Sequence, residues 1–225
     1  MLLIYSHTSS ARLQYICSFI LKELLGIDFS ITIDSEEFKN YKGARINYSS
    51  SKIPASDFNI QNHSLLFENN IKEQATGCFQ MNEYKAFFKI PDSDWPFDIF
   101  AATFYLISRY EEYLPHEKDM YGRYAHTNSL AFKENFLHLP LINMWIQEFQ
   151  KIIQQKFHSF TIHVSPFRFL PTYDIDIAYA FKNHSFFKNW IGLSKDLGTA
   201  NFKSFYQRFF AMIGTGSDPF DTYGW

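Results

Sequence analysis

The chain has 225 residues, of which 46% are hydrophobic and 20% aromatic. A chain of this length can bury roughly 70% of its unfolded surface without disulfides or metals, so it can form a substantial core. Its 21 lysines and arginines against 23 acidic residues give a formal charge of -2. The balance excludes a global basic field, and we therefore expect no nucleic-acid or membrane partner.

The cysteines and the apolar runs indicate the compartment. Of the two cysteines, Cys17 lies on the apolar face of a predicted helix, which favours free thiols in a reducing compartment over a disulfide to Cys78. The N-terminus, MLLIYSHTSS, has no basic region of a secretion signal. The longest uncharged apolar run, IFAATFYLIS, is far shorter than the ~20 residues that span a bilayer. We therefore expect a cytoplasmic protein.

The N-terminal residues predict a β-α-β unit. Leu2 to Tyr5 form an apolar run typical of a buried strand. Apolar residues then recur at helical spacing from Ser10 to Leu25, and Gly26 is a natural helix stop. In DFSITID apolar and polar residues alternate, which predicts a half-exposed strand. The first loop, SHTSSA, has no glycine and so does not indicate a glycine-rich phosphate-binding loop.

Short strands and two further helices are predicted next. ARINYS and KAFFKI alternate like strands of a mixed sheet. A helix is predicted from SDWPFDIF onward, with Ser93 and Asp94 as capping candidates. A long polar loop, 114–129, follows, and such loops are often functional. The segment from Leu139 to Phe157 has the clearest helical periodicity.

The segment FRFLPTYDID places two acids, Asp174 and Asp176, after a strand-like run. In a strand the two side chains would project from the same side, about 6.5 Å apart along the chain. Close carboxylates are costly unless a cation compensates them, so the pair indicates a divalent metal site. One acid would bind the metal while the other takes a proton from the metal-bound water. The alternative, that both acids cap the following turn or helix, stays open on spacing alone.

Other candidate residues carry weaker signals. None of the eight histidines forms an H-x-x-x-H or H-E-x-x-H pair. His116 and His126 lie in or beside the polar loop and could act as ligands or bases, but a lone histidine is more often packed or solvated. Arg109 could clamp an anion, although an ion pair with Glu112 three residues on explains it as well.

Several segments together resemble a known family: WPFDIFAATFYLISRYEEYLPHEKDMYGRY, SLAFKENFLHLPLINMWI, FRFLPTYDIDIAYAF and DPFDTYGW. They look like the N-terminal part of polysaccharide-deacetylase-like proteins of the Bacteroidetes type, over most of Pro96 to Trp225. Such proteins have an uncharacterised N-terminal domain followed by a NodB-type deacetylase domain of carbohydrate esterase family 4, built as an irregular (β/α) barrel. The first motif of that barrel, T-[FY]-D-x-[DG], is matched by TYDID at residues 172–176.

The resemblance implies a fold and a site. The fold class would be α/β: a mixed α/β domain of unknown role over residues 1–165, then the first strand and helices of an incomplete deacetylase barrel over 166–225. Asp174 would be the catalytic base and Asp176 a ligand of a divalent metal, most often zinc. The family needs two histidine ligands from an H-x-x-x-H motif that this sequence lacks. The complete protein would deacetylate an acetylated glycan, whereas this chain alone would bind no metal tightly and be inactive.

Two other functions remain open. A metal-dependent glycosyltransferase also uses an apolar strand that ends in D-x-D to hold a divalent ion. A non-catalytic carbohydrate-binding or interaction module would instead use aromatic side chains around the polar loop, of which the candidates are Trp95, Tyr113, Tyr121 and Tyr124. Strand edges exposed by an incomplete barrel would favour a homo-oligomer.

Overall fold

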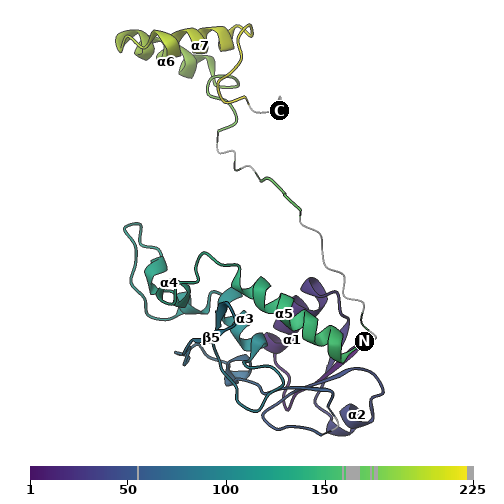
Figure 1. Cartoon of the computed structure of the whole chain (residues 1–225). Coiled ribbons are helices and arrows are strands. Elements are labelled where there is room, and N and C mark those ends of the chain that lie inside the picture. The colour runs from purple at the N-terminus through teal and green to yellow at the C-terminus, as the bar shows by residue number, and fades with distance from the viewer. Residues whose placement is uncertain (55, 159, 161–167, 173, 175–176, 222–225) are drawn as a thin grey trace. The chain divides into compact units, whose positions relative to one another are not determined.

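The computed structural model describes the chain except for residues 55, 159, 161–167, 173, 175–176 and 222–225. The chain has a mixed α/β fold and divides into two compact units, Met1–Ser165 and Pro166–Trp225 (Figure 1). Each unit is held together by its own contacts. No helix in the described ranges is long and apolar enough to cross a membrane.

The first unit is built on a parallel sheet with strand order β2-β1-β3-β4. The strands are β1 (Leu2–Tyr5), β2 (Phe29–Thr32), β3 (Arg45–Tyr48) and β4 (Phe58–Ile60). The central strand β1 places Ile4 opposite Ile31 on one side and opposite Ile46 on the other. Because parallel neighbours need a crossover connection, a helix separates β1 from β2. The predicted β-α-β unit is confirmed.

The first helix follows the predicted bounds closely. It runs as α1 (Ala11–Cys17) and continues as the π-helix η1 (Ser18–Leu24). The Ser10 side chain accepts a hydrogen bond from the backbone N–H of Leu13 at 3.0 Å, as expected of an N-cap. Gly26 has a positive φ of 67°, a conformation that favours glycine and ends the helix.

The next long helix, α3 (Ile99–Ile107), begins later than predicted. Its N-cap is Asp98, whose carboxylate accepts from the Ala101 N–H at 2.9 Å. The predicted caps, Ser93 and Asp94, instead bind the edge of the sheet: each hydrogen-bonds to the backbone of Asn59 in β4. Asp94 and Asp98 are both competent caps locally, so the tertiary contact of Asp94 with Asn59 decides that the helix begins after Asp98.

The main core lies between the sheet and the helices α1, α3 and α5 (Leu141–Lys156). The periodicity that predicted a helix from Leu139 to Phe157 is confirmed. Aromatic rings join these elements, as in the contact between Phe97 and Trp145 at 5.0 Å. The Trp145 indole N–H donates to the Lys85 carbonyl at 2.9 Å, so its one polar group is satisfied. A smaller cluster joins Phe38 of α2 (Ser35–Asn40) to Leu3 and Tyr5.

A two-stranded antiparallel sheet, β5 (Phe79–Met81) and β6 (Tyr84–Ala86), precedes α3. The strand predicted at KAFFKI is therefore too long, because regular pairing stops at Ala86. The next two residues, Phe87 and Phe88, are both buried, which breaks the alternation of a strand. Phe88 has a positive φ of 57°. The remaining short elements are η2 (Ser64–Phe67), η3 (Tyr110–Tyr113), η4 (His126–Asn128) and α4 (Leu130–Lys133).

The second unit contains the helices α6 (Phe186–Gly198) and α7 (Phe202–Met212), which lie side by side (Figure 1). The Asp196 carboxylate of α6 accepts from the Arg208 guanidinium at 3.0 Å and from the Ser204 hydroxyl at 3.2 Å, both on α7. Polar side chains therefore form part of the contact between the two helices, in which Leu193 and Ala211 are also buried.

The strand predicted over FRFLPTYDID, with Asp174 and Asp176 at its end, is not found in the described residues 168–172 and 174, which form no regular structure. Asp176 lies outside the described residues. A strand is held by backbone hydrogen bonds to a neighbouring strand. The described part of the second unit consists of helices, turns and irregular segments, so it offers no such neighbour.

Both cysteines are free, as expected: Cys17 is buried and Cys78 is half-buried. Burial raises the pKa of both thiols, that of Cys78 to about 11. Thiols with raised pKa values react slowly, because the thiolate is the nucleophile.

A buried carboxylate joins three parts of the first unit. The Asp98 side chain is fully buried and, besides its bond to α3, accepts from the Tyr48 hydroxyl at 2.7 Å and from the His63 N–H at 2.6 Å. Burial raises the pKa of Asp98 to about 6, although these hydrogen bonds act to lower it. The acid thus links the end of β3, the segment after β4 and the start of α3.

Asp98 should make the stability of the first unit depend on pH. Its folded-state pKa exceeds that of the unfolded chain, so its stabilising contribution is present below about pH 4 and is lost as the pH rises through about 6. We expect the free energy of unfolding to fall by about 1 kcal/mol more between pH 5 and 7 in the wild type than in Asp98→Asn. Urea unfolding followed by circular dichroism measures this difference. The exposed Asp28→Asn variant should keep the wild-type slope, and an unchanged slope in Asp98→Asn would contradict the prediction.

In the second unit the Asp218 carboxylate joins two backbone segments through hydrogen bonds, as Asp98 does in the first unit. This buried carboxylate accepts from the backbone N–H groups of Ala180, Phe181, Lys182 and Phe220. Desolvation acts to raise the pKa of Asp218, but the N–H donors outweigh it and lower the pKa to about 2. Its stabilising contribution is therefore present above about pH 4 and is lost as the pH falls towards 2.

Replacing Asp218 by Ala leaves these N–H groups without their acceptor, which should cost about 2–4 kcal/mol. We expect trypsin to cleave the second unit at least tenfold faster in Asp218→Ala, while cleavage of the first unit stays unchanged. The exposed Asp174→Ala variant in the same unit is the control. Equal cleavage rates in the two variants would show that Asp218 does not hold the turn.

Candidate functional site

The site predicted from the sequence lies in an exposed, irregular segment. Asp174 is exposed, and so are the residues described just before it, among them Phe169 and Leu170 at 78% and 79%. The structure brings no described residue into contact with Asp174 as a second ligand. Across the described ranges, no group of three or more histidines, cysteines, aspartates and glutamates is placed to hold a metal ion.

The second unit carries a large apolar surface on both of its helices. The buried residues between α6 and α7 include polar ones, such as Asn189 and Asp196, whereas most of the large apolar residues face outward. The exposed apolar residues of these helices and their ends are Phe186, Phe187, Trp190, Ile191, Leu197, Phe202, Tyr206, Phe209, Phe210 and Ile213. Apolar surface on this scale marks an interface with other protein or with a ligand.

The aromatic residues proposed for a carbohydrate-binding module divide into two groups. Trp95 is 1% exposed and belongs to the core, and Tyr124 is half-buried. Tyr113 and Tyr121 are 68% and 71% exposed, and the Arg123 guanidinium lies 5.5 Å from the centre of the Tyr121 ring. Two of the four candidates are therefore available to a ligand.

The base of the polar loop holds a cluster of ionisable groups. The half-buried Glu111 accepts from the Leu130 N–H at 2.7 Å and also binds Tyr105, and burial raises the pKa of Glu111. Burial and the Glu111 carboxylate raise the pKa of Tyr124 to about 12. The His116 ring packs against Tyr124 at 5.0 Å. These contacts fix the loop to its neighbours.

The other loop candidates have structural contacts too. The exposed His126 packs its ring against Phe132 at 5.1 Å. Arg109 forms an ion pair with Glu112, the partner that the sequence favoured. Arg109 itself adopts a left-handed backbone conformation, with φ of 52°, between α3 and η3. The ion pair between Arg109 and Glu112 was predicted correctly, but the left-handed backbone conformation of Arg109 was not predicted.

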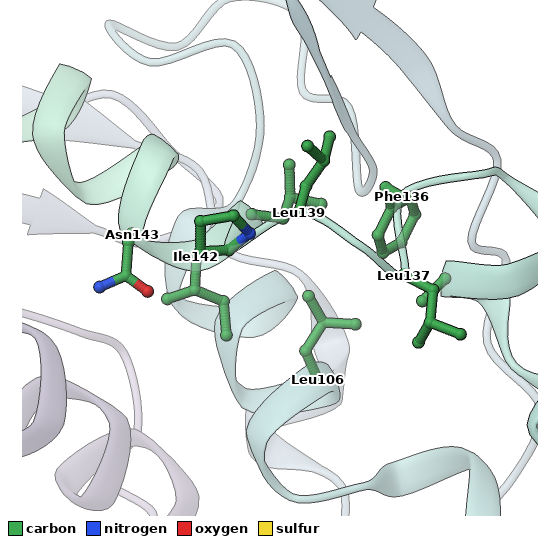
Figure 2. A pocket seen from close by; sticks show the side chains of 9 residues that line it. Leu106, Phe136, Leu137, Leu139, Ile142 and Asn143 are labelled. Carbon is green, nitrogen blue, oxygen red and sulfur yellow. The ribbon is translucent and has the colours of Figure 1, made fainter. Parts of the chain in front are cut away.

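An open apolar hollow of about 260 Å³ lies where the end of α3 meets the segment before α5 (Figure 2). Leu106, Phe136, Leu139 and Ile142 line it, and Asn143 lies at its edge. Its lining residues include no titratable side chain. The hollow can accept an apolar group but supplies no acid, base or nucleophile.

Comparison with known proteins places the first unit. Residues 2–158 match a family described as "Family of unknown function (DUF7033)". Among curated proteins and solved structures, none matches the chain. The family match spans the parallel sheet, the polar loop and α5, and ends before the segment that contains Asp174. Since the match covers more than half of its residues, the chain belongs to DUF7033, a family of unknown function.

Proposed function

We propose that the chain is the N-terminal part of a polysaccharide deacetylase-like protein, which removes acetyl groups from a carbohydrate. In this proposal Asp174 is the catalytic base, Asp176 binds a divalent metal such as zinc, and residues 166–225 begin a NodB-type barrel. The TYDID motif and its surrounding segments support this assignment by resemblance. The metal would supply activated water.

The observation that carries the proposal is the outward apolar surface of α6 and α7. Helices of a (β/α) barrel bury an apolar face against the strands that they surround. Here the two helices pack on each other through Asp196 and Arg208 and leave their aromatic residues exposed. Such a pair has the surface of helices whose sheet is contributed by other residues, and this is the expectation for the start of a larger domain.

The residues of this chain do not by themselves fit a complete zinc site. A catalytic zinc ion takes three protein ligands, and no described group of three candidate ligands exists. What this chain contributes is an exposed carboxylate, Asp174, at the start of the second unit. A carboxylate in that position can take the proton of a water molecule as it attacks an acetyl carbonyl.

Zinc titration tests the incompleteness of the site. We expect isothermal titration of the 225-residue chain with ZnCl₂ to give the same weak heats as the double variant Asp174→Asn/Asp176→Asn, because two carboxylates are too few ligands. Tight, saturable binding that the double variant loses would contradict this expectation.

The catalytic role of Asp174 is tested in a protein that extends the chain through an H-x-x-x-H motif. We expect Asp174→Asn to lower acetate release from an acetylated glycan by about 10²–10⁴-fold, the usual effect of losing a general base. Asp28→Asn, an exposed change in the first unit, should leave the rate unchanged. Full activity of Asp174→Asn would remove the catalytic assignment.

A second candidate function, carbohydrate binding by the first unit, is favoured by the exposed rings of Tyr113 and Tyr121. The double variant Tyr113→Ala/Tyr121→Ala is expected to reduce binding to a glycan array at least tenfold, because the apolar faces of a sugar pack on such rings. Tyr15→Ala, which removes another half-exposed tyrosine, should not change binding. Equal binding of the two variants would exclude this role for the loop.

A further inference from the structure

The parallel sheet of the first unit has two edge strands, β2 and β4, and their outer sides differ. At β4 the Asn59 N–H donates to the Asp94 carboxylate at 2.7 Å, and the Asn59 carbonyl accepts from the Asp94 N–H at 2.8 Å. The Ser93 hydroxyl donates to the same carbonyl at 2.9 Å. The outward backbone groups of Asn59 are thus satisfied within the chain, and this edge is closed to a further strand.

The outer side of β2 has no such cover among the described residues. The Leu2 N–H of β1 donates to the Asp28 carbonyl at 2.8 Å, so residues 28, 30 and 32 turn their backbone groups towards β1. Because successive residues of a parallel strand bond to opposite neighbours, the backbone groups of Phe29 and Ile31 point away from β1. No hydrogen bond joins them to another described residue.

The sequence of β2 lacks the usual features that protect an exposed edge. Natural edge strands are protected by lysine, by proline or by a bulge, and the four residues FSIT include neither residue type. The half-buried side chains of Phe29 and Ile31 pack against the main core, and Ile33 on the same side is 60% exposed. An added strand with apolar residues at alternate positions would therefore extend this apolar surface.

The charges beside β2 are all of one sign. Residues 28–37 contain four acids and no lysine, arginine or histidine. Two of these acids, Asp28 and Asp34, flank the strand, and both are exposed. Opposite charges on neighbouring strands attract each other, whereas like charges directly opposite destabilise the pair. The edge is therefore complementary to a strand with basic residues at both ends.

The same charges disfavour a second copy of this chain as the added strand. Two β2 strands can pair antiparallel with Ile31 opposite its own symmetry mate, which also pairs Phe29 with Ile33. That register uses all three outward residues, but it places Asp28 of one copy opposite Asp34 of the other. The repulsion recurs at both ends of the pair.

We propose that β2 is a docking site for an extended basic peptide, which adds a fifth strand to the four-stranded sheet in antiparallel orientation. Basic residues of the peptide lie opposite Asp28 and Asp34, and apolar residues lie opposite Phe29, Ile31 and Ile33. In this mode of recognition the backbone hydrogen bonds supply affinity, and alternate side chains supply specificity. The site lies within the first unit and does not depend on the deacetylase proposal.

The test is the binding of fluorescein-labelled peptides to the whole chain, measured by fluorescence anisotropy. The peptide KVTVTVK has valines for the three apolar positions and lysines for the two acids, and we expect saturable binding below about 200 µM. EVTVTVE should bind about tenfold more weakly, because both end charges become repulsive. KVTPTVK, whose proline removes the N–H that faces Ile31, should not bind. Absence of KVTVTVK binding, or equal binding of all three peptides, would overturn the proposal.

Amide hydrogen exchange followed by NMR locates the peptide and tests whether the edge is open. In the free chain we expect the amides of Phe29 and Ile31 to exchange about a hundredfold faster than those of Ser30 and Thr32, which face β1. Saturating KVTVTVK should slow the two fast amides. Slow exchange of Phe29 and Ile31 in the free chain would show that another segment already covers the edge, and would overturn the proposal.

A double variant tests the role of the two acids. Asp28→Asn/Asp34→Asn removes both charges and keeps a residue that can cap α2, and it should weaken KVTVTVK binding about fivefold. The matched control Glu73→Gln/Glu83→Gln, at exposed acids outside β2, should leave the affinity unchanged. Circular dichroism confirms that both variants keep the fold. Equal affinities of the two double variants would place the peptide elsewhere.

Discussion

The first unit depends on one buried acid. Asp98 receives hydrogen bonds from Tyr48 at the end of β3, from the backbone at His63 and from the first turn of α3. Each of these segments contributes to the wall of the main core, so the position of α3 against the sheet is set where the three bonds meet. Removing a buried carboxylate from water is unfavourable, and the three donors offset part of that cost. The directional hydrogen bonds of Asp98 therefore restrict the position of α3 more than apolar packing alone would.

The second unit has a different balance of forces. Its helices meet through Asp196, Ser204 and Arg208, and the Arg208 guanidinium also lies 4.5 Å from the centre of the Phe181 ring. Polar contacts are directional and so fix the angle between two helices, but they add little net stability. The apolar residues that would supply such stability face outward. The second unit is thus well specified in shape yet short of buried apolar area, a combination that suits a segment completed by other protein.

The sequence predicts local features of this fold better than long-range ones. The β-α-β start could be predicted because its periodicity, its Ser10 cap and the Gly26 stop are all local. The start of α3 could not, since Asp94 and Asp98 are equivalent caps until the contact with Asn59 is known. The strand-like run before Asp174 is irregular where the structure describes it, and the reason is related: an apolar run describes one strand, whereas a strand exists only with a neighbour.

The candidate sites show the same division between local features, which the sequence predicts, and long-range ones, which it does not. The TYDID motif singled out Asp174 by resemblance, and its exposure is compatible with a role at a surface. The four aromatic candidates for sugar binding were grouped by sequence, but burial separates Trp95 from Tyr113 and Tyr121.

The position of β1 has a consequence for how the protein is made. Of the four strands of this sheet, β1 is synthesised first and lies between β2 and β3, so it must wait for two later strands to form its hydrogen bonds. Until Arg45–Tyr48 has been synthesised, one edge of Leu2–Tyr5 stays open to other chains. A version of the protein without Leu2–Tyr5 would lack the centre of its sheet and leave two unconnected edges in its place.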